Sequence, residues 1–359
     1  MDAHTDFSRS GSSRFVLPAR NLSRRGFLAV AGGSALAAMS LLAGCGGGAS
    51  SGGSTGADGL IKVSFGSSLW PSCMLYRLAA EKGIAKKNGL DLEIKKFSSS
   101  TETNTAMVSG QLDFANYPSP DTIAPFTQGA TFKVVLLNDE SNGAEGIVAK
   151  PEIKTVADLK GKTIATQLYS ADHMLLLTLL KDNGMSADDV NIVDMTIEAS
   201  SNAFIAGKCD AASVWDPYFS EAKAKGGTEL YSTADNPNLI TDCLVANGDL
   251  VKGNPKAVQA MCQSYLDAIA WWQDNKEEAD AYMAEELGTT PDDFEAQMAT
   301  LKLPTVESAQ KAFEKADDYT YWAYTQNNIR DFLYGLKQID SKPDCAEMID
   351  DTFVKGLKA

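Results

Sequence analysis

The chain has 359 residues, enough for about two domains, and its 44% hydrophobic and 22% charged content is typical of a globular protein with a buried core. The formal net charge of −15 argues against binding to nucleic acids or anionic membranes, because such binding depends mainly on basic side chains. With only two histidines, catalysis or zinc binding that depends on histidine is not expected either.

The first 44 residues are predicted to be an export signal. Arg24 and Arg25 stand before an apolar run at 27–42 that is rich in glycine and alanine. The run has roughly 16 residues, fewer than the ~20 that a membrane-spanning helix needs. A basic region followed by a short apolar region is typical of a signal peptide, and residues 23–28 resemble a twin-arginine signal.

A cysteine follows this segment directly. Residues 42–45 read Leu-Ala-Gly-Cys and resemble the lipobox of bacterial lipoproteins, in which the cysteine becomes the lipidated first residue. Residues 45–58 are rich in glycine and serine, as a flexible tether would be. We expect an exported protein that only the lipid on Cys45 anchors to the extracytoplasmic face of the membrane. A chance cysteine after an ordinary signal is the alternative. Because the signal holds five arginines and two aspartates, the mature chain would have a net charge of −18.

Two similar series of elements follow, and we interpret them as an internal duplication that gives two α/β lobes of related topology. The predicted elements are strand 62–65, helix 71–82 and strand 90–94, then strand 162–166, helix 171–181 and strand 190–193. Each series continues with a helix that ends at a glycine, a short strand, and a proline that opens another helix. The matched positions are Gly110 and Gly207, Asp113 and Asp210, Ala115 and Ala212, and Pro120 and Pro217. Chance similarity of Gly-x-x-Asp-x-Ala segments is the alternative.

Helical spacing of apolar residues dominates the last third of the chain. The predicted helices are 255–272, 276–286, 291–301, 305–315, 319–336 and 343–357. We expect this tail to return to the first lobe and complete it. The predicted domains are therefore a first lobe of residues 59–145 and 247–359 and a second lobe of residues 146–246.

Four junctions between a strand and a helix, at 67–71, 117–120, 167–170 and 214–217, are the predicted ligand site. In open α/β sheets, ligands bind beyond the carboxyl ends of the strands, where free N–H groups and hydroxyls can hold an anion without arginine. The candidate binding residues are Ser68, Trp70, Tyr117, Ser119, Tyr169, Ser170, His173, Trp215 and Asp216. Ser119 and Asp216 are also predicted N-caps. The alternative is that the hydroxyls only cap helices and the aromatic rings belong to the core.

At residues 108–115, 159–165 and 212–218 the chain resembles the solute-binding components of ABC importers for taurine, aliphatic sulfonates and nitrate. The resemblance extends over about residues 60–340. It implies a type II periplasmic-binding-protein-like fold, with two α/β lobes joined by two crossover strands that close on a ligand as a hinge. The crossovers would lie at 146–149 and 243–246.

The resemblance also implies roles for three residues. Ser119 matches a serine that meets the sulfonate, Trp215 matches a tryptophan that lines the pocket, and Asp242 falls where an acidic residue can meet an amine. A hinge or surface carboxylate is the alternative for Asp242. The chain departs from the family pattern in that Leu69 or Trp70 stands in place of an acidic residue. Bulkier residues, Tyr117 and Pro118, also stand near the predicted anion site.

The expected function is capture of a small organic anion or zwitterion, taurine-like or sulfonate-like, and its delivery to a permease driven by a separate ATPase. We expect a monomer that binds no nucleic acid, metal or cofactor and catalyses no reaction. Nitrate, bicarbonate, or a thiamine-pyrimidine or other heterocyclic precursor are alternative ligands. An enzyme of the thiamine-pyrimidine synthase type and a structural lipoprotein are less favoured alternatives. The five cysteines other than Cys45 are expected to be buried thiols, although one or two disulfides stay open.

Overall fold

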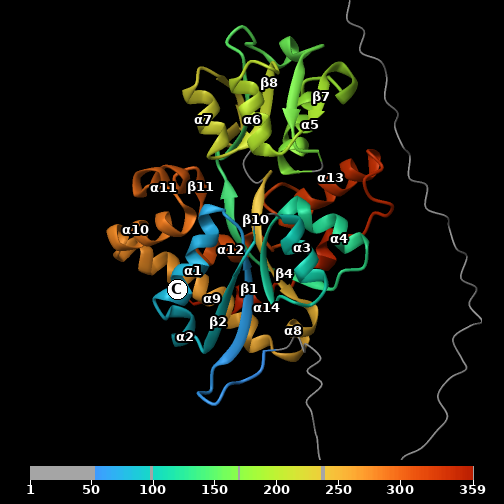
Figure 1. Ribbon diagram of the computed structural model, residues 1–359. Coiled ribbons are helices and arrows are strands. Elements are labelled where there is room, and N and C mark those ends of the chain that lie inside the picture. Colours follow the sequence, from blue (N-terminus) through green and yellow to red (C-terminus); the bar gives the residue numbers. More distant parts are fainter. Residues whose placement is uncertain (1–52, 98–99, 169, 236–238, 359) are drawn as a thin grey trace, which may run out of the picture. The chain divides into compact units, whose positions relative to one another are not determined.

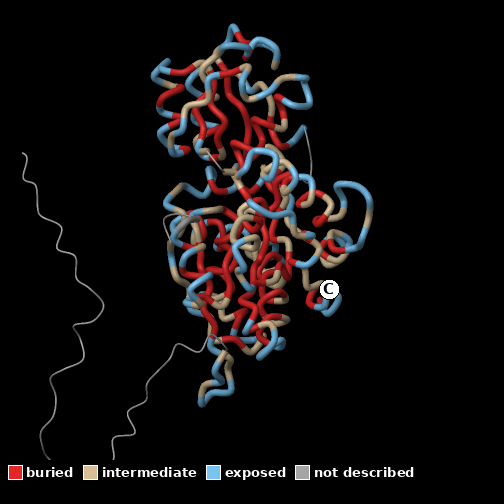
Figure 2. The backbone as a smooth tube through the Cα atoms, turned by 90° about the vertical axis from the view of Figure 1, so that its right-hand side faces the viewer, coloured by how far each residue is buried: buried red, intermediate tan, exposed pale blue. Residues whose placement is uncertain are grey.

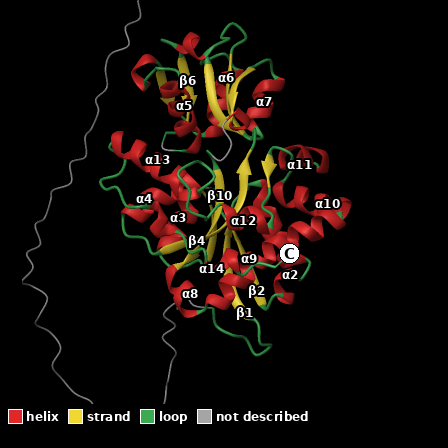
Figure 3. Ribbon diagram, turned by 180° about the vertical axis from the view of Figure 1, so that it is seen from behind, coloured by secondary structure: helices red, strands yellow, loops and turns green. Residues whose placement is uncertain are grey.

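The computed structural model describes residues 53–97, 100–168, 170–235 and 239–358. The export signal, Cys45 and most of the tether lie outside the described residues, as does Tyr169. Within the described part of the chain, no helix is both long enough and apolar enough to cross a membrane. The elements belong to two β-sheets with helices around them (Figures 1 and 3).

The first sheet has six strands in the order β11-β4-β10-β3-β1-β2. Its strands are β1 (Ile61–Ser67), β2 (Leu90–Lys96), β3 (Phe114–Pro118), β4 (Phe132–Ser141), β10 (Thr241–Asn247) and β11 (Leu301–Lys302). Strand β1 is parallel to β2 and β3, whereas β10 is antiparallel to both β3 and β4. The carboxyl ends of β1 and β3 therefore lie at the same edge of the sheet, which is also where β10 begins.

The second sheet has five strands in the order β7-β6-β8-β5-β9. Its strands are β5 (Glu145–Ala149), β6 (Thr163–Thr166), β7 (Asn191–Asp194), β8 (Ala211–Trp215) and β9 (Thr228–Ser232). Strand β6 is parallel to β7 and β8, and β5 is antiparallel to β8 and β9. This order repeats that of β2-β1-β3-β10-β4, so the predicted duplication is confirmed.

The matched glycines end their helices as predicted. Gly110 and Gly207 have φ angles of 73° and 70°, in the left-handed region that glycine adopts without a steric penalty. A short strand follows each of them, β3 and β8 respectively. The two copies therefore share the conformation of a turn as well as its sequence.

Helices surround both sheets. Those between the strands of the first sheet are η1 (Pro71–Cys73), α1 (Met74–Glu81), α2 (Ile84–Lys87), α3 (Ser100–Val108), η2 (Ser119–Thr122) and α4 (Ile123–Thr127). Those of the second sheet are η3 (Val156–Leu159), α5 (Ala171–Asp182), η4 (Ala187–Asp189), α6 (Ile197–Ile205), α7 (Tyr218–Ala224) and η5 (Thr233–Asp235). Figure 2 shows that the buried residues are concentrated in the interior and the exposed residues along the outer turns of the chain.

The helical tail packs on the first sheet, as predicted. It consists of α8 (Gly248–Gly253), α9 (Pro255–Asp274), α10 (Lys276–Leu287), α11 (Pro291–Met298), α12 (Val306–Lys311), α13 (Trp322–Gly335), η6 (Cys345–Met348) and α14 (Thr352–Lys355). Tyr265 of α9 is fully buried against Tyr76 of α1, with ring centroids 4.6 Å apart. Met283, Phe294 and Met348 belong to the same apolar core as strands β1 and β3.

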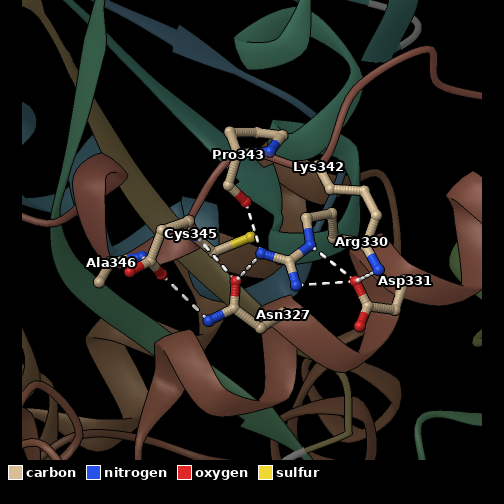
Figure 4. Close-up of polar contacts among 8 residues, drawn as sticks. Asn327, Arg330, Asp331, Lys342, Pro343, Cys345 and Ala346 are labelled. Carbon is tan, nitrogen blue, oxygen red and sulfur yellow. Dashed lines mark hydrogen bonds and ion pairs between the residues drawn. The ribbon is translucent and has the colours of Figure 1, made fainter.

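Two predictions for the tail were wrong. Leu301 does not end a helix. It belongs to β11, where it pairs with Ser141 of β4. The predicted helix 343–357 is broken into η6 and α14, because the residues between these helices pair with β4: Ile349 forms a bridge with Val134, and the Asp350 N–H donates to the Val134 carbonyl at 3.0 Å. Contacts with α13 also hold the chain where η6 begins (Figure 4). Arg330 donates to the carbonyl of Pro343 at 2.6 Å, and the Cys345 N–H donates to Asn327 Oδ1 at 2.9 Å.

The chain passes from the first sheet to the second between β4 and β5, and it returns between β9 and β10. The predicted crossovers 146–149 and 243–246 fall in β5 and β10, each of which is antiparallel to its neighbours. Both strands are fully buried. Ala144, just before β5, accepts a hydrogen bond from the Asp216 N–H at 2.8 Å.

The five cysteines of the described chain are Cys73, Cys209, Cys243, Cys262 and Cys345, and all of them are free and buried. The expectation of buried thiols is confirmed. Burial raises the pKa of Cys73 to about 12, so this thiol is protonated at neutral pH.

Gly146 in β5 is required by packing. A Cβ atom at this position would overlap the ring of Phe219, which is fully buried. We predict that Gly146→Ala lowers the free energy of unfolding by about 1–3 kcal/mol, the usual cost of overpacking. Denaturant titration measures this change.

Gly335→Ala is the matched control. A Cβ at Gly335 would meet nothing within 4 Å, and this residue ends α13. The control should leave the stability unchanged or raise it by up to about 1 kcal/mol, because alanine is the better helix former. Equal stability of Gly146→Ala and the parent would contradict the packing at β5.

Candidate functional site

Two aspartates lie side by side on the neighbouring strands β4 and β10 of the first sheet, near the edge where β10 begins. Asp242 of β10 is paired in register with Asp139 of β4 and with Pro118 at the end of β3. Asp242 accepts a hydrogen bond from Asn116 Nδ2 at 2.5 Å, and Asp139 accepts one from Trp70 Nε1 at 3.1 Å. Trp70 and Asp242, both predicted site residues, are thus brought together through Asp139.

Ser119 is fully buried next to this pair. Its hydroxyl is 2.7 Å from Thr241 Oγ1 and accepts a hydrogen bond from Trp322 Nε1 at 2.8 Å. The prediction that Ser119 caps a helix was wrong, because the N-cap of η2 is Pro118 and no side chain caps this turn. The hydroxyl instead links Trp322, the first residue of α13, to Thr241, the first residue of β10, through hydrogen bonds.

Two other predicted residues of the first lobe have partners elsewhere. Tyr117 is buried, and its hydroxyl lies 3.5 Å from the carbonyl of Thr103. Ser68 is partly buried, with Oγ 3.5 Å from Cys73 Sγ. Leu69, between Ser68 and Trp70, is 63% exposed and does not belong to the core.

In the second lobe, Ser170 and Asp216 each accept a hydrogen bond at the start of a helix, and Ser170 is the N-cap of its helix. Ser170 Oγ accepts from the His173 N–H at 3.3 Å at the start of α5. The prediction that Asp216 is the N-cap was wrong, because the N-cap of α7 is Pro217, but Asp216 Oδ1 still accepts from the Ser220 N–H at 2.8 Å in the first turn of this helix. His173 is buried, and burial lowers its pKa. Trp215 is partly buried and pairs in register with Glu145 of β5.

The sequence analysis missed four acidic residues near these positions: Asp121, Asp139, Glu145 and Asp172. Asp172 is 0% exposed in the first turn of α5, and neither of its carboxylate oxygens has a hydrogen-bond partner. Its backbone carbonyl accepts from Ser213 Oγ of β8 at 2.8 Å. Glu145 is also buried and accepts a short hydrogen bond from Ser141. The position of Asp172 two residues after Ser170, in the first turn of the helix that follows the junction 167–170, was the signal that could have identified it.

These four residues and Asp242 form one group, here called the acidic cluster. The first lobe contributes Asp121, Asp139 and Asp242, and the second contributes Glu145 and Asp172. Asp121 is partly exposed, and the other four are buried. No lysine or arginine of the described chain forms an ion pair with any of the five.

Burial is the main cause of raised pKa values throughout the acidic cluster. It raises the pKa of Asp139 to about 6, of Asp121 to about 7 and of Asp172 to about 8. The pKa values of Glu145 and Asp242 are also raised well above the ordinary range. Mutual repulsion adds to burial, since Asp121 raises the pKa of Asp172, and Asp172 raises that of Glu145. The carboxylates of the two lobes are therefore close enough to interact.

Two surface hollows lie away from this region. One is lined by residues of β1 and β2, including Lys62 and Glu93, and the other by residues of α9, including Lys256 and Gln263. Neither contains a predicted site residue. In the described part of the chain, no group of three or more histidine, cysteine, aspartate or glutamate side chains is arranged to hold a metal ion.

Solved structures of similar proteins show the fold of this chain. The aliphatic sulphonate binding protein SsuA from Escherichia coli is similar with a TM-score of 0.68 and 23% identity, over 82% of this chain and 99% of that one. The desulfurization enzyme DszB is similar with a TM-score of 0.58 and 14% identity, over 82% and 97%. The predicted two-lobed periplasmic-binding-protein-like fold is thus confirmed.

The family follows from the sequence match at residues 70–279, which covers more than half of the chain. The chain belongs to the NMT1/THI5-like family. A putative aliphatic sulfonates-binding protein of Bacillus subtilis is 27% identical over 89% of this chain and 94% of that protein. The taurine-binding periplasmic protein of Escherichia coli is 30% identical over 53% and 60%.

Other relatives are matched over a shorter stretch. A putative binding protein of Brucella abortus is 29% identical over 56% of this chain. The chain spans 63% of the length of that relative.

We predict that the free energy of unfolding falls as the pH rises from about 5 to about 8.5. The unfolded pKa of an aspartate is about 3.9, whereas burial raises that of Asp121 to about 7 and that of Asp172 to about 8. Between these values the folded chain holds more protons than the unfolded chain. The contribution of these two carboxyls to the free energy of unfolding is therefore fully present at low pH. It is lost as the pH rises through their pKa values in the folded chain. Denaturant titration without added ligand measures it.

Asp172→Asn should flatten this dependence and be more stable than the parent at about pH 8.5, because the amide cannot ionise. Asp182→Asn, an exposed residue of the same helix, is the control and should keep the parent's pH dependence. A parent whose stability rises over the same range would refute the raised pKa values.

Proposed function

We propose that this chain is the extracytoplasmic solute-binding component of an ABC importer. It captures a small organic anion or zwitterion, taurine-like or sulfonate-like, between its two lobes and delivers the ligand to a membrane permease driven by a separate ATPase. The protein acts as a monomer and does not change its ligand chemically.

The observation that carries this proposal is the meeting of buried polar groups from both lobes at the carboxyl ends of parallel strands. Trp70, Asp242 and Asp139 come from the first lobe, and Asp172 and Glu145 from the second. A ligand held between such groups would tie the two lobes together, which is how a hinged binder closes. Membership of the NMT1/THI5-like family and the names of the relatives support the ligand class.

The proposed ligand site retains the residues predicted from the sequence and adds the acidic cluster. Trp70 and Trp215 are both partly buried, so each has a face available to an organic group. The predicted lobe boundaries, 59–145 with 247–359 and 146–246, are proposed as the two bodies that move on closure.

A heterocyclic precursor is the second candidate ligand. A putative thiamine biosynthesis protein of Haemophilus influenzae is 26% identical over 37% of this chain, which favours this alternative over nitrate or bicarbonate. Aminopyrimidine nitrogens could also donate hydrogen bonds to carboxylates such as Asp242.

An enzymatic role is disfavoured by the state of the thiols. Cys73 lies near Asp139 and Asp242, and burial raises its pKa to about 12. A nucleophilic cysteine requires the thiolate, which a pKa this high suppresses at neutral pH. Cys243 is likewise buried with a pKa raised well above the ordinary range.

The proposed location rests on the sequence of the first 58 residues. Export through the signal at 1–44 and lipidation at Cys45 would hold the binder near its permease, and residues 46–58 would let it reach the permease as a flexible tether.

Thermal unfolding with a panel of small molecules tests the function. The panel contains taurine, alkanesulfonates, nitrate, bicarbonate and an aminopyrimidine. A ligand at 100 times its Kd adds about 2.7 kcal/mol to the free energy of unfolding, so at least one organic member should raise the Tm. Absence of any shift would rule out the proposed ligand classes, and release of a changed product would indicate an enzyme.

Trp215→Ala should weaken binding of the panel member that shifts the Tm by at least about tenfold. The control is Tyr334→Ala, which removes an aromatic residue that is 45% exposed on α13. Equal affinity of Trp215→Ala and the parent would show that the site lies elsewhere.

Cys45→Ser tests the anchor. In a bacterial host with lipoprotein processing, the parent should be found in the membrane fraction and should incorporate labelled fatty acid. The variant should do neither, because serine provides no thiol for the lipid. Cys73→Ser is the control, since Cys73 is a buried thiol of the described fold and should not affect lipidation. An unlabelled parent would overturn the proposed anchor.

A further inference from the structure

After residue 44 the chain contains only two arginines, Arg77 and Arg330. Arg77 lies in α1 and is 2% exposed, so its charge is almost completely removed from water. Burying a guanidinium is costly unless its donors are satisfied and its charge is balanced. The partners of Arg77 therefore indicate what this buried charge does in the fold.

All three nitrogens of the Arg77 guanidinium donate hydrogen bonds. Nε donates to Ser67 Oγ at 2.9 Å, and Nη2 donates to the carbonyl of Ser68 at 3.3 Å. Nη1 donates to the carbonyl and to Oε2 of Glu286, at 3.1 and 2.9 Å. Ser67 ends β1 and Ser68 follows it in the first strand-to-helix junction, whereas Glu286 lies near the end of α10. One buried side chain thus joins this junction to the helical tail.

Glu286 is itself held from a second side. Its Oε2 also forms an ion pair with Lys96 Nζ at 2.7 Å, at the end of β2. Lys96 and Arg77 lower the pKa of Glu286, so this carboxyl is ionised at neutral pH and balances the buried guanidinium. The helix α10 packs against α1, and the Tyr282 hydroxyl donates to the Arg77 carbonyl at 3.5 Å. The guanidinium therefore has a fixed partner in the tail.

The junction that Arg77 holds contains residues of the proposed ligand site. Trp70 lies two residues after the Ser68 carbonyl and donates from Nε1 to Asp139 at 3.1 Å. Between them, Leu69 is 63% exposed, so packing of its side chain does not hold the backbone. The charge-assisted hydrogen bond from Arg77 to the Ser68 carbonyl restrains the backbone just before Trp70. The orientation of Trp70 thus depends on a residue of α1 as well as on Asp139.

We propose that Arg77 is a positioning residue of the ligand site. Its guanidinium sets the conformation of residues 68–70 and so the direction in which Trp70 faces the ligand. This inference deepens the proposed function and rests on it, and it gives Arg77 no direct contact with the ligand. A site whose residues are fixed before binding loses less conformational entropy when the ligand enters. A looser junction should therefore weaken binding even though every group that touches the ligand is still present.

The number of partners explains why this position needs an arginine. A guanidinium carries its N–H donors in a rigid planar fork, whereas a lysine ammonium is a point charge on a flexible stem. A lysine at position 77 could keep the ion pair with Glu286, but it could not also hold Ser67 Oγ and the Ser68 carbonyl in a fixed geometry. Arg77→Lys therefore keeps the charge and removes the positioning.

Arg77→Lys tests the inference, and Arg330→Lys is the matched control. Arg330 also donates to a backbone carbonyl, that of Pro343, and to a carboxylate, that of Asp331, but it holds the tail after α13. Both variants should lower the Tm of the ligand-free protein. The mature proteins are titrated calorimetrically with taurine, propane-1-sulfonate and an aminopyrimidine, well below every Tm. For each probe that binds the parent, only Arg77→Lys should weaken binding, by at least about tenfold.

A second measurement needs no ligand. With 5-fluorotryptophan incorporated, ¹⁹F NMR gives a signal for each of the five tryptophans, and Trp70→Phe identifies the signal of Trp70. Arg77→Lys should shift or broaden this signal, because the backbone before Trp70 is released. Arg330→Lys should leave it unchanged. A purely structural role of Arg77 would lower the Tm without changing either the Trp70 signal or the affinity.

The outcomes separate the inference from the proposed function. An unchanged Trp70 signal in Arg77→Lys, or an affinity equal to that of the parent, would overturn the inference and leave the proposed function intact. If Arg77→Lys does not fold, Glu286→Gln takes its place, since it removes the balancing charge but keeps an acceptor for Nη1. The same changes in signal and affinity are then expected, and their absence counts against the inference. If none of the probes binds the parent and the wider panel gives no Tm shift, the proposed function fails and the inference fails with it.

Discussion

The crossover strands β5 and β10 are the constraint on which the rest of the structure depends. Each runs antiparallel between two strands of its sheet, and each is buried along its whole length. Because both belong to the segments that pass between the lobes, residues at their ends are brought to the junction. Glu145 begins β5, and Asp242 lies near the start of β10. A change in either strand would disturb a sheet and the candidate site together.

The acidic cluster is a stability cost concentrated at this junction. Burial favours the neutral form of each carboxyl, and the raised pKa values express that preference. Core positions are ordinarily filled with apolar side chains, which would pack here without this penalty. Proteins keep unfavourable groups at sites where binding repays the cost. The unpartnered oxygens of Asp172 and the unpartnered amide of Gln326 fit this pattern, since neither contributes a hydrogen bond to the fold.

Periodicity and turn chemistry in the sequence were sufficient for most of the elements. Helix α5 was predicted at 171–181 and observed at Ala171–Asp182, and both glycine caps were found at the expected residues. The errors came where distant contacts override local preference. Apolar spacing favoured one helix at 343–357, but Ile349 and Asp350 in the middle of this segment pair with Val134 of β4. Leu301 was likewise taken into a sheet by pairing with Ser141.

The residues of the candidate site also fall into two groups, those that the sequence predicted and those that only the tertiary structure brought together. By itself, the sequence determined the duplication, the two α/β lobes and the strand-to-helix junctions, because these depend on patterns within a few dozen residues. It also predicted Trp70, from its strand-to-helix junction, and Asp242, from the resemblance to the family, and their part in binding stays a prediction. Only the tertiary structure decided that Ser119 fastens α13 and that Asp139, Glu145 and Asp172 gather with Asp242. The physical reason is that the burial of these carboxyls, and the repulsion between them, depend on which distant strands become neighbours. The pairing of β10 with β3 and β4 joins segments that are far apart in the sequence, so no single segment predicts it.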